Sequence, residues 1–133
     1  MGKMLKGHGV GKGQAEGEAL VTRQMISNDY IGFADGVYRE KDHELDGQKV
    51  GGKILVFPAG KGSSVVANSL MLAKAVGGAP AAMVFERANT IQVQSALLAQ
   101  IPAVYSLKES LLEGIKTGQK VKVDAYNGTV EIL

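Results

Sequence analysis

A glycine-rich stretch that carries two hydroxyls and a lysine is the part of this sequence best equipped for chemistry. The segment Pro58–Ser64 follows an apolar run at 54–57 that predicts a strand, and it leads into a helical pattern at 64–76. At such a junction the backbone N–H groups and the positive end of the helix dipole favour an anion. The stretch therefore predicts an anion-binding loop, with Lys61 as an additional positive charge.

Two alternatives stay open for the serines of this loop. In the simpler one, Ser63 or Ser64 caps the helix that follows, as serine often does. In the other, one serine caps while its neighbour, Lys61 and the loop amides hold a carboxylate or a phosphate. A serine that acts as a base needs its alkoxide stabilised by positive surroundings, because a free hydroxyl holds its proton very tightly.

The spacing of the glycines excludes the common nucleotide motifs. A Walker loop needs Gly-Lys followed by Ser or Thr, but here Gly62 follows Lys61, and Leu55 stands where the first glycine belongs. The glycines of segment 7–13 precede a strand instead of following one, and their spacing fails the dinucleotide fingerprint. We therefore expect neither an ATPase nor a nicotinamide or flavin site.

A self-contained serine hydrolase is also unexpected. The two histidines, His8 and His43, lie far apart in polar segments, and we interpret both as surface residues. The Gly-x-Ser-x-Gly nucleophile elbow is absent. The polar segment Glu86–Asn89 follows a second apolar strand, where α/β sheets place ligand-binding loops, although solvated charges explain it equally well.

Composition narrows the classes further. The 133 residues suit one domain, and the net charge of +2 is too small to indicate nucleic-acid binding. There is no cysteine, which excludes disulfides, zinc–thiolate sites and an iron–sulfur cluster held by this chain alone. No apolar stretch approaches about 20 residues, so we expect no transmembrane helix and a cytoplasmic protein.

The pattern of apolar residues predicts an α/β fold. A small central parallel sheet with helices is expected, with glycine-punctuated β-structure attached as a barrel-like or sandwich layer, all in one domain over 1–133. Alternation on both sides of Asn127-Gly128 predicts a closing hairpin. The charged segment 39–46 is interpreted as a solvated connection. The expected strands lie at 18–23, 54–57, 81–85, 103–105, 121–126 and 129–133, and the expected helices at 64–76, 90–99 and 107–114.

Several separated motifs, at 17–21, 42–48, 55–64, 78–82 and 101–104, resemble the small subunit of the aconitase X family. The resemblance implies a swivelling β/β/α domain, like the small domain of aconitases. It also implies a heterodimer or larger assembly, in which this domain closes over an active site built by a large subunit. In the family the iron–sulfur cluster is held by that large subunit.

The same resemblance assigns roles in the loop. The family's Gly-Ser-Ser loop supplies the serine that abstracts or returns a proton during dehydration; it maps onto Ser63, with Ser64 as the fallback. Lys61, Gly62 and Ser64 would bind the oxyanions of a small anionic substrate. Two departures concern substrate identity: Lys61 stands where relatives commonly have arginine, and Val65 stands where an arginine or another hydroxyl often follows.

Two substrates fit this resemblance. Archaeal members with a separate small subunit dehydrate (R)-5-phosphomevalonate to trans-anhydromevalonate 5-phosphate in isoprenoid synthesis by the mevalonate pathway. Bacterial relatives dehydrate cis-3-hydroxy-L-proline. The separate, lysine-rich chain without cysteine favours the first hydro-lyase activity. A non-catalytic module that binds an anionic metabolite is the remaining alternative.

Overall fold

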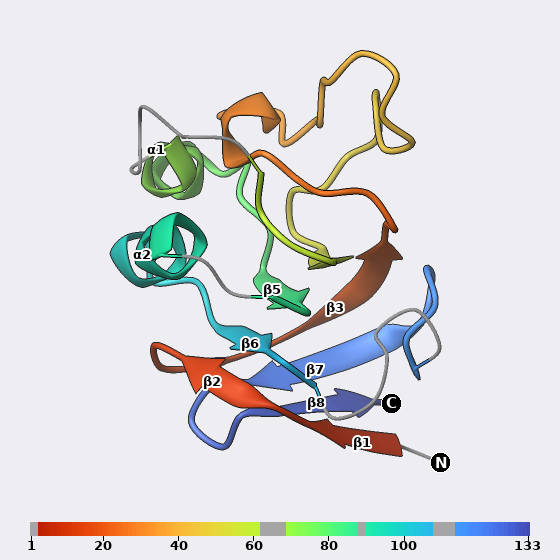
Figure 1. The fold of residues 1–133 in the computed structure, drawn as a ribbon. Coiled ribbons are helices and arrows are strands. Elements are labelled where there is room, and N and C mark those ends of the chain that lie inside the picture. The colour runs from red at the N-terminus through yellow and green to blue at the C-terminus, as the bar shows by residue number, and fades with distance from the viewer. Residues whose placement is uncertain (1–2, 62–68, 88–89, 108–113) are drawn as a thin grey trace.

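The computed structural model describes residues 3–61, 69–87, 90–107 and 114–133. Within them, strands and short helices alternate along the middle of the chain, and strands occupy both ends (Figure 1). The elements are β1 (Lys3–Lys6), β2 (His8–Val10), β3 (Gln14–Val21), η1 (Asn28–Tyr30), β4 (Ile54–Phe57), α1 (Ser69–Val76), β5 (Ala82–Phe85), α2 (Thr90–Ala99), β6 (Ala103–Tyr105), β7 (Lys120–Asp124) and β8 (Thr129–Ile132).

One continuous sheet joins all of these strands in the order β1-β8-β7-β3-β4-β5-β6-β2. The neighbours β3, β4, β5 and β6 are parallel, whereas β1, β8, β7 and β3 form an antiparallel half, and β2 closes the other edge antiparallel to β6. The predicted fold class, a parallel centre with an attached β layer, is confirmed.

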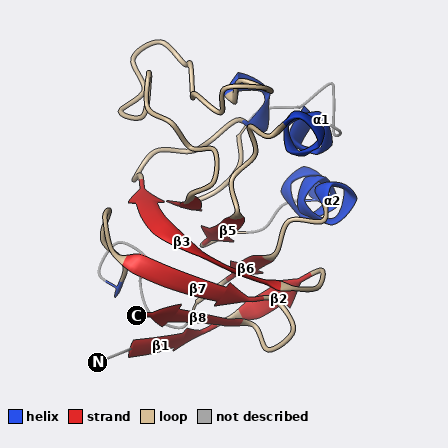
Figure 2. Ribbon diagram, turned by 180° about the vertical axis from the view of Figure 1, so that it is seen from behind, coloured by secondary structure: helices blue, strands red, loops and turns tan. Residues whose placement is uncertain are grey.

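The sheet curls back on itself at the N-terminal strands. β1 and β2 stand at opposite ends of the strand order, yet only Gly7 separates them in the chain. The two edges of the sheet must therefore meet there, and Gly7 donates its N–H to the Gly128 carbonyl at 2.8 Å. Figures 1 and 2 show β1, β2, β7 and β8 gathered as one curved layer, with α1 and α2 on the opposite side of the parallel strands.

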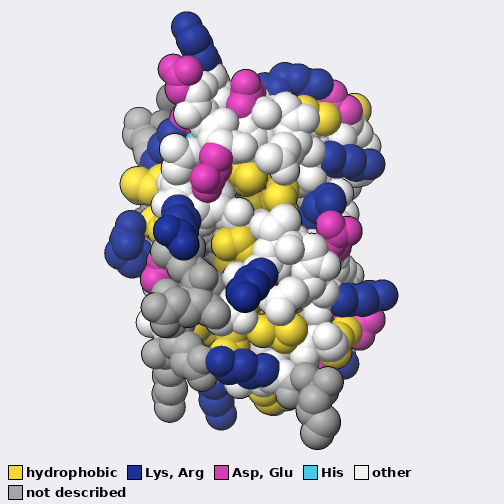
Figure 3. Space-filling view, turned by 90° about the vertical axis from the view of Figure 1, so that its right-hand side faces the viewer, with side chains coloured by type: hydrophobic (Ala, Val, Ile, Leu, Met, Phe, Trp, Pro, Cys, Tyr) yellow, Lys and Arg dark blue, Asp and Glu magenta, His cyan; other side chains and the backbone are white. Residues whose placement is uncertain are grey.

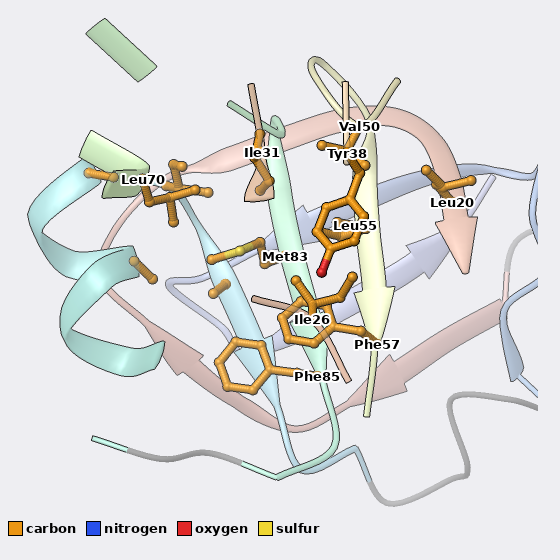
Figure 4. Packing of buried hydrophobic residues seen from close by; sticks show 14 of the residues in the cluster. Leu20, Ile26, Ile31, Tyr38, Val50, Leu55, Phe57, Leu70, Met83 and Phe85 are labelled. Carbon is orange, nitrogen blue, oxygen red and sulfur yellow. The ribbon is translucent and has the colours of Figure 1, made fainter. Parts of the chain in front are cut away.

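The parallel strands are buried on both faces, which explains their continuous apolar sequences. In β4, Ile54 and Val56 point into the cluster enclosed by the curled sheet, while Leu55 and Phe57 point toward the helices and loops. All four side chains are at most 1% exposed. Figure 4 shows the second cluster, in which Leu55, Phe57, Met83 and Phe85 pack under Leu70, Ile31 and Tyr38.

Most of the predicted boundaries agree with the structure. The helix at 90–99 and the strand at 103–105 have the predicted bounds, and β5 begins one residue later than expected. β3 begins four residues before the predicted strand. Two predictions lie partly outside the described residues: the start of the helix predicted at 64, since the described part of α1 begins at Ser69, and residues 108–113 of the helix predicted at 107–114.

The closing hairpin is confirmed, but its turn is longer than the Asn-Gly pair suggested. Asp124 pairs with Thr129, so residues 125–128 form the connection. The Asp124 carboxylate accepts the backbone N–H groups of Tyr126 and Asn127 at 2.9 and 3.2 Å, which ends β7 two residues before the predicted boundary.

The surface carries charges of both signs. On the face seen in Figure 3, lysine and arginine side chains are interspersed with aspartate and glutamate, and small apolar areas lie between them. Within the part of the chain that the structure describes, no helix is long and apolar enough to cross a membrane.

Candidate functional site at the carboxyl end of β4

The loop that follows β4 lies beside the segment that follows β5. The backbone N–H groups of Glu86 and Arg87 both donate to the Pro58 carbonyl, at 3.1 and 2.9 Å. Because β4 and β5 are parallel, their carboxyl ends share one edge of the sheet. The two candidate loops of the sequence are therefore neighbours, as far as Arg87; residues 88 and 89 lie outside the described part.

A third segment extends the sheet pairing along the candidate loop. The Thr22 N–H donates to the Val56 carbonyl, the Ile26 N–H to Ala59, and the Lys61 N–H donates back to the Ile26 carbonyl, at 2.9, 3.1 and 2.9 Å. Ile26 and Gly60 form a parallel bridge. The backbone of the loop is thus held by ladder hydrogen bonds up to Lys61.

The side chain of Lys61 is also held. Its ammonium group forms an ion pair with Oε2 of Glu40, in which the lysine side chain is 35% exposed and the glutamate side chain 16%. Burial alone would raise the pKa of Glu40, but the hydrogen bonds from Lys61 and Tyr38 outweigh it and hold that pKa below its usual value. Glu40 is therefore an ionised partner at neutral pH.

Glu40 is in turn fixed by Tyr38. The tyrosine hydroxyl donates to Oε1 of Glu40 at 2.7 Å and accepts the Ser27 N–H at 3.0 Å. Burial, with the nearby glutamate, raises the pKa of Tyr38 well above its usual value, so the hydroxyl keeps its proton. Figure 4 shows the Tyr38 ring lying along β4, with its hydroxyl directed toward the end of the strand where Phe57 lies.

The far end of the candidate loop has its own anchor. Ser69, the first described residue of α1, donates its hydroxyl to Oδ1 of Asp29 at 2.6 Å. Figures 1 and 2 agree in placing η1, which contains Asp29, beside α1. Lys61 and Ser69 thus bracket the stretch that contains Gly62, Ser63 and Ser64. Those three predicted site residues lie outside the described residues.

Five of the eight residues of segment 39–46 are exposed, as a solvated connection predicts, but the interpretation of His43 as a surface residue is wrong. His43 is 8% exposed and packs against Tyr38 in a tilted arrangement, with ring centroids 4.9 Å apart and 58° between the ring planes. Its Nδ1 accepts the Leu45 N–H at 3.0 Å, so Nε2 carries the proton that it donates to the Met25 carbonyl, also at 3.0 Å. A tight turn buries this histidine; His8, by contrast, is exposed as expected.

Hydrogen bonds of Glu44 connect segment 39–46 to the residues that follow β3. Its Oε1 accepts both the Thr22 hydroxyl and the Arg23 N–H, and its own N–H donates to Oε1 of Gln24 at 2.7 Å. The hydrogen bond from Thr22, followed by that from Arg23, lowers the pKa of Glu44. The segment that carries Tyr38 and Glu40 is therefore attached to the one that pairs with the loop.

Replacing Glu44 with glutamine is expected to lower the free energy of unfolding at pH 7 by about 0.5–1 kcal/mol, since neutral acceptors replace charged ones at a partly exposed site. A carboxyl whose pKa is lowered by folding stabilises the fold above its unfolded-state pKa, about 4.3, and loses that contribution as the pH falls. Urea titrations at pH 7 and about pH 3 should therefore show a smaller acid loss in E44Q than in the wild type. Asp46→Asn, an exposed carboxylate two residues on, is the control and should leave this pH dependence unchanged.

No metal-binding cluster accompanies these residues in the described ranges. No group of three or more His, Cys, Asp or Glu side chains there could hold a metal ion. The whole sequence lacks cysteine, so this chain cannot supply thiolate ligands to an iron–sulfur cluster.

Comparison with known proteins settles the family. The model of the aconitase X swivel domain matches residues 4–132. The chain belongs to the aconitase X swivel family.

Relatives agree over nearly the whole length. The chain is 42% identical to the phosphomevalonate dehydratase small subunit of Archaeoglobus fulgidus, over 92% of each chain, and 41% identical to that of Thermococcus kodakarensis, over 97% and 96%. The crystal structure of Thermococcus kodakaraensis aconitase X in its holo-form superimposes with a TM-score of 0.90 at 37% identity, covering 98% of each chain. The predicted family and fold are confirmed.

Sequence reasoning missed the contribution of Tyr38, Glu40 and Glu44 to this swivel domain. One signal was available: the stretch 42–48 already resembled the family, although no chemistry could be assigned to it. In the structure, hydrogen bonds of His43 and Glu44 hold in place the segment that carries Tyr38 and Glu40, and this segment contacts the candidate loop.

Proposed function

We propose that this chain is the small subunit of a two-subunit hydro-lyase that dehydrates (R)-5-phosphomevalonate to trans-anhydromevalonate 5-phosphate. The observation that carries the proposal is the similarity, at 41–42% identity over at least nine-tenths of the chain, to proteins named phosphomevalonate dehydratase small subunit. The curated relatives favour this substrate over cis-3-hydroxy-L-proline.

In the proposed reaction, the alkoxide of Ser63 takes a proton from the carbon beside the substrate carboxylate while the C–O bond of the neighbouring carbon breaks. The hydroxyl leaves as hydroxide and becomes water by taking up a proton, and loss of the proton gained by the serine restores its alkoxide. The alkoxide form of serine would be stabilised by the loop amides and by the positive charge of Lys61. Lys61, Gly62 and Ser64 would bind the substrate's oxyanions. The fixed backbone as far as Lys61 supports this assignment, because proton transfer needs groups held in place.

The remaining parts of the active site would come from a large subunit, including the ligands of an iron–sulfur cluster. The absence of cysteine from this chain requires another chain for such ligands. Because each subunit would hold only part of the site, we propose that activity depends on their association.

The proposal predicts that dehydration appears only when this chain is combined with the aconitase-like large subunit of the same organism. The test incubates each subunit alone and the reconstituted pair with (R)-5-phosphomevalonate, and follows the product by phosphorus NMR. The pair should turn the substrate over, whereas either subunit alone should not. Turnover of cis-3-hydroxy-L-proline alone would replace the substrate assignment. Failure of the subunits to associate, with tight binding of phosphomevalonate by this chain, would instead support an anion-binding module.

A further inference from the structure

Glu40 occupies a position between a buried anchor and the lysine of the candidate loop. One carboxylate oxygen accepts the Tyr38 hydroxyl at 2.7 Å, and the other pairs with the Lys61 ammonium. Both carboxylate oxygens of Glu40 therefore have a partner, and the hydrogen bond from Tyr38 sets the orientation of the carboxylate.

The tyrosine anchor is rigid for identifiable reasons. Tyr38 is fully buried in the core under the helices, and the Ser27 N–H donates to its hydroxyl at 3.0 Å. Its ring packs against His43, whose two ring nitrogens are both hydrogen-bonded to backbone. A side chain constrained on three sides holds Glu40 in one place.

We infer that Glu40 is a positioning residue, which sets where the ammonium group of Lys61 meets the substrate anion. This inference rests on the proposed function, in which Lys61 binds that anion. An ammonium group has three N–H donors, so pairing with one carboxylate oxygen leaves donors for a substrate oxyanion. A free lysine side chain would lose rotamer entropy on binding, and the pair removes part of that loss beforehand.

The charges around Lys61 support positioning by Glu40 over simple neutralisation. If the carboxylate only cancelled a surface charge, an exposed pair such as that of Asp35 and Arg39, at 2.6 Å, would serve equally well. Glu40 instead lies mostly buried, at 16% side-chain exposure, and is fixed by a second hydrogen bond from the core. That arrangement constrains direction as well as charge.

The test measures kcat and KM for (R)-5-phosphomevalonate in the reconstituted two-subunit enzyme. Lys61→Met is expected to raise KM by about tenfold or more, as loss of a charged contact does. Glu40→Gln should raise KM by about fivefold with kcat within about threefold, because binding of substrate and transition state weaken together. In the Lys61→Met background, Glu40→Gln should cause no further rise.

Two further variants separate positioning from general damage. Tyr38→Phe leaves the carboxylate in place but removes its anchor, and it should raise KM in the same direction as Glu40→Gln, again only when Lys61 is present. Asp35→Asn breaks the exposed ion pair between Asp35 and Arg39 and removes one negative charge, as Glu40→Gln does. It should leave KM and kcat unchanged.

Several results would overturn the inference. An equal rise of KM from Glu40→Gln with and without Lys61 would mean that the substitution damages the loop generally. Unchanged KM in both Glu40→Gln and Tyr38→Phe, with a raised KM in Lys61→Met, would mean that Lys61 needs no positioning. Both results leave the wild-type activity, and hence the proposed function, intact. An inactive wild-type pair would overturn the proposed function and the inference together.

Discussion

Replacing Ser63 with alanine is expected to lower kcat of the reconstituted enzyme by about a hundredfold to ten-thousandfold, the range in which a positioned general base contributes. The substitution removes one hydroxyl and adds no bulk, so binding of the large subunit and the melting temperature should stay near those of the wild type. The measurement is kcat under saturating (R)-5-phosphomevalonate, with thermal unfolding recorded on the same preparation.

Ser64→Ala is the matched control, because it removes the same hydroxyl one residue further on. With Ser63 as the base and Ser64 as an oxyanion donor, Ser64→Ala should mainly raise KM, by about tenfold, and change kcat much less. The reverse pattern would transfer the role of base to Ser64. Near-normal kcat in Ser63→Ala and Ser64→Ala alike would remove both serines from the chemistry and leave the helix-capping alternative.

The parallel centre of the fold was predictable because its signals are local. β4 and β5 are continuous apolar runs of strand length, and both faces of each strand are indeed buried. α2 has the predicted bounds, and a positive φ of 55° at Gln100 marks its end. Apolar runs and helix ends depend on about ten consecutive residues, so they can be predicted without knowing which other elements pack against them.

The support of the candidate loop was not predictable in this way. Segment 39–46 looks like a solvated connection because it is charged, yet His43 is buried by contacts with Met25 and Tyr38. The inferred role of Glu40 depends on its ion pair with Lys61, which lies 21 residues further along the chain. Such pairings depend on the tertiary fold, and a single sequence gives no signal for them beyond the resemblance of stretch 42–48 to the family.

The close packing of the backbone around the glycines that follow α1 also depends on the tertiary fold. In the sequence, Gly78 follows the helix predicted at 64–76 and begins the stretch 78–82 that resembles the family. In the structure it lies where three backbone segments meet: a Cβ built on Gly78 would lie 2.2 Å from the Phe33 carbonyl oxygen and 2.5 Å from that of Gly32. From the third segment, a Cβ on Gly51 would lie 3.0 Å from the carbonyl oxygen of Gly78.

Gly78→Ala is therefore expected to lower the free energy of unfolding by about 3 kcal/mol or more, since backbone atoms cannot yield as the end of a side chain can. The Cβ would displace Gly32 and Phe33, which lie six and five residues before Tyr38. The substitution should therefore also shift Tyr38, and with it the positions of Glu40 and Lys61. Urea unfolding of the isolated chain measures the first effect, and KM of the reconstituted enzyme measures the second.

The adjacent glycine is the control that separates crowding from backbone strain. Gly77 has a φ of +95°, but a Cβ there would meet nothing within 4 Å. Gly77→Ala should consequently lose only the conformational preference of glycine, about 1 kcal/mol, and leave KM unchanged. If the two alanine variants were destabilised equally, close packing at Gly78 would contribute nothing, and the three-segment junction could not be what holds the Tyr38 segment in place.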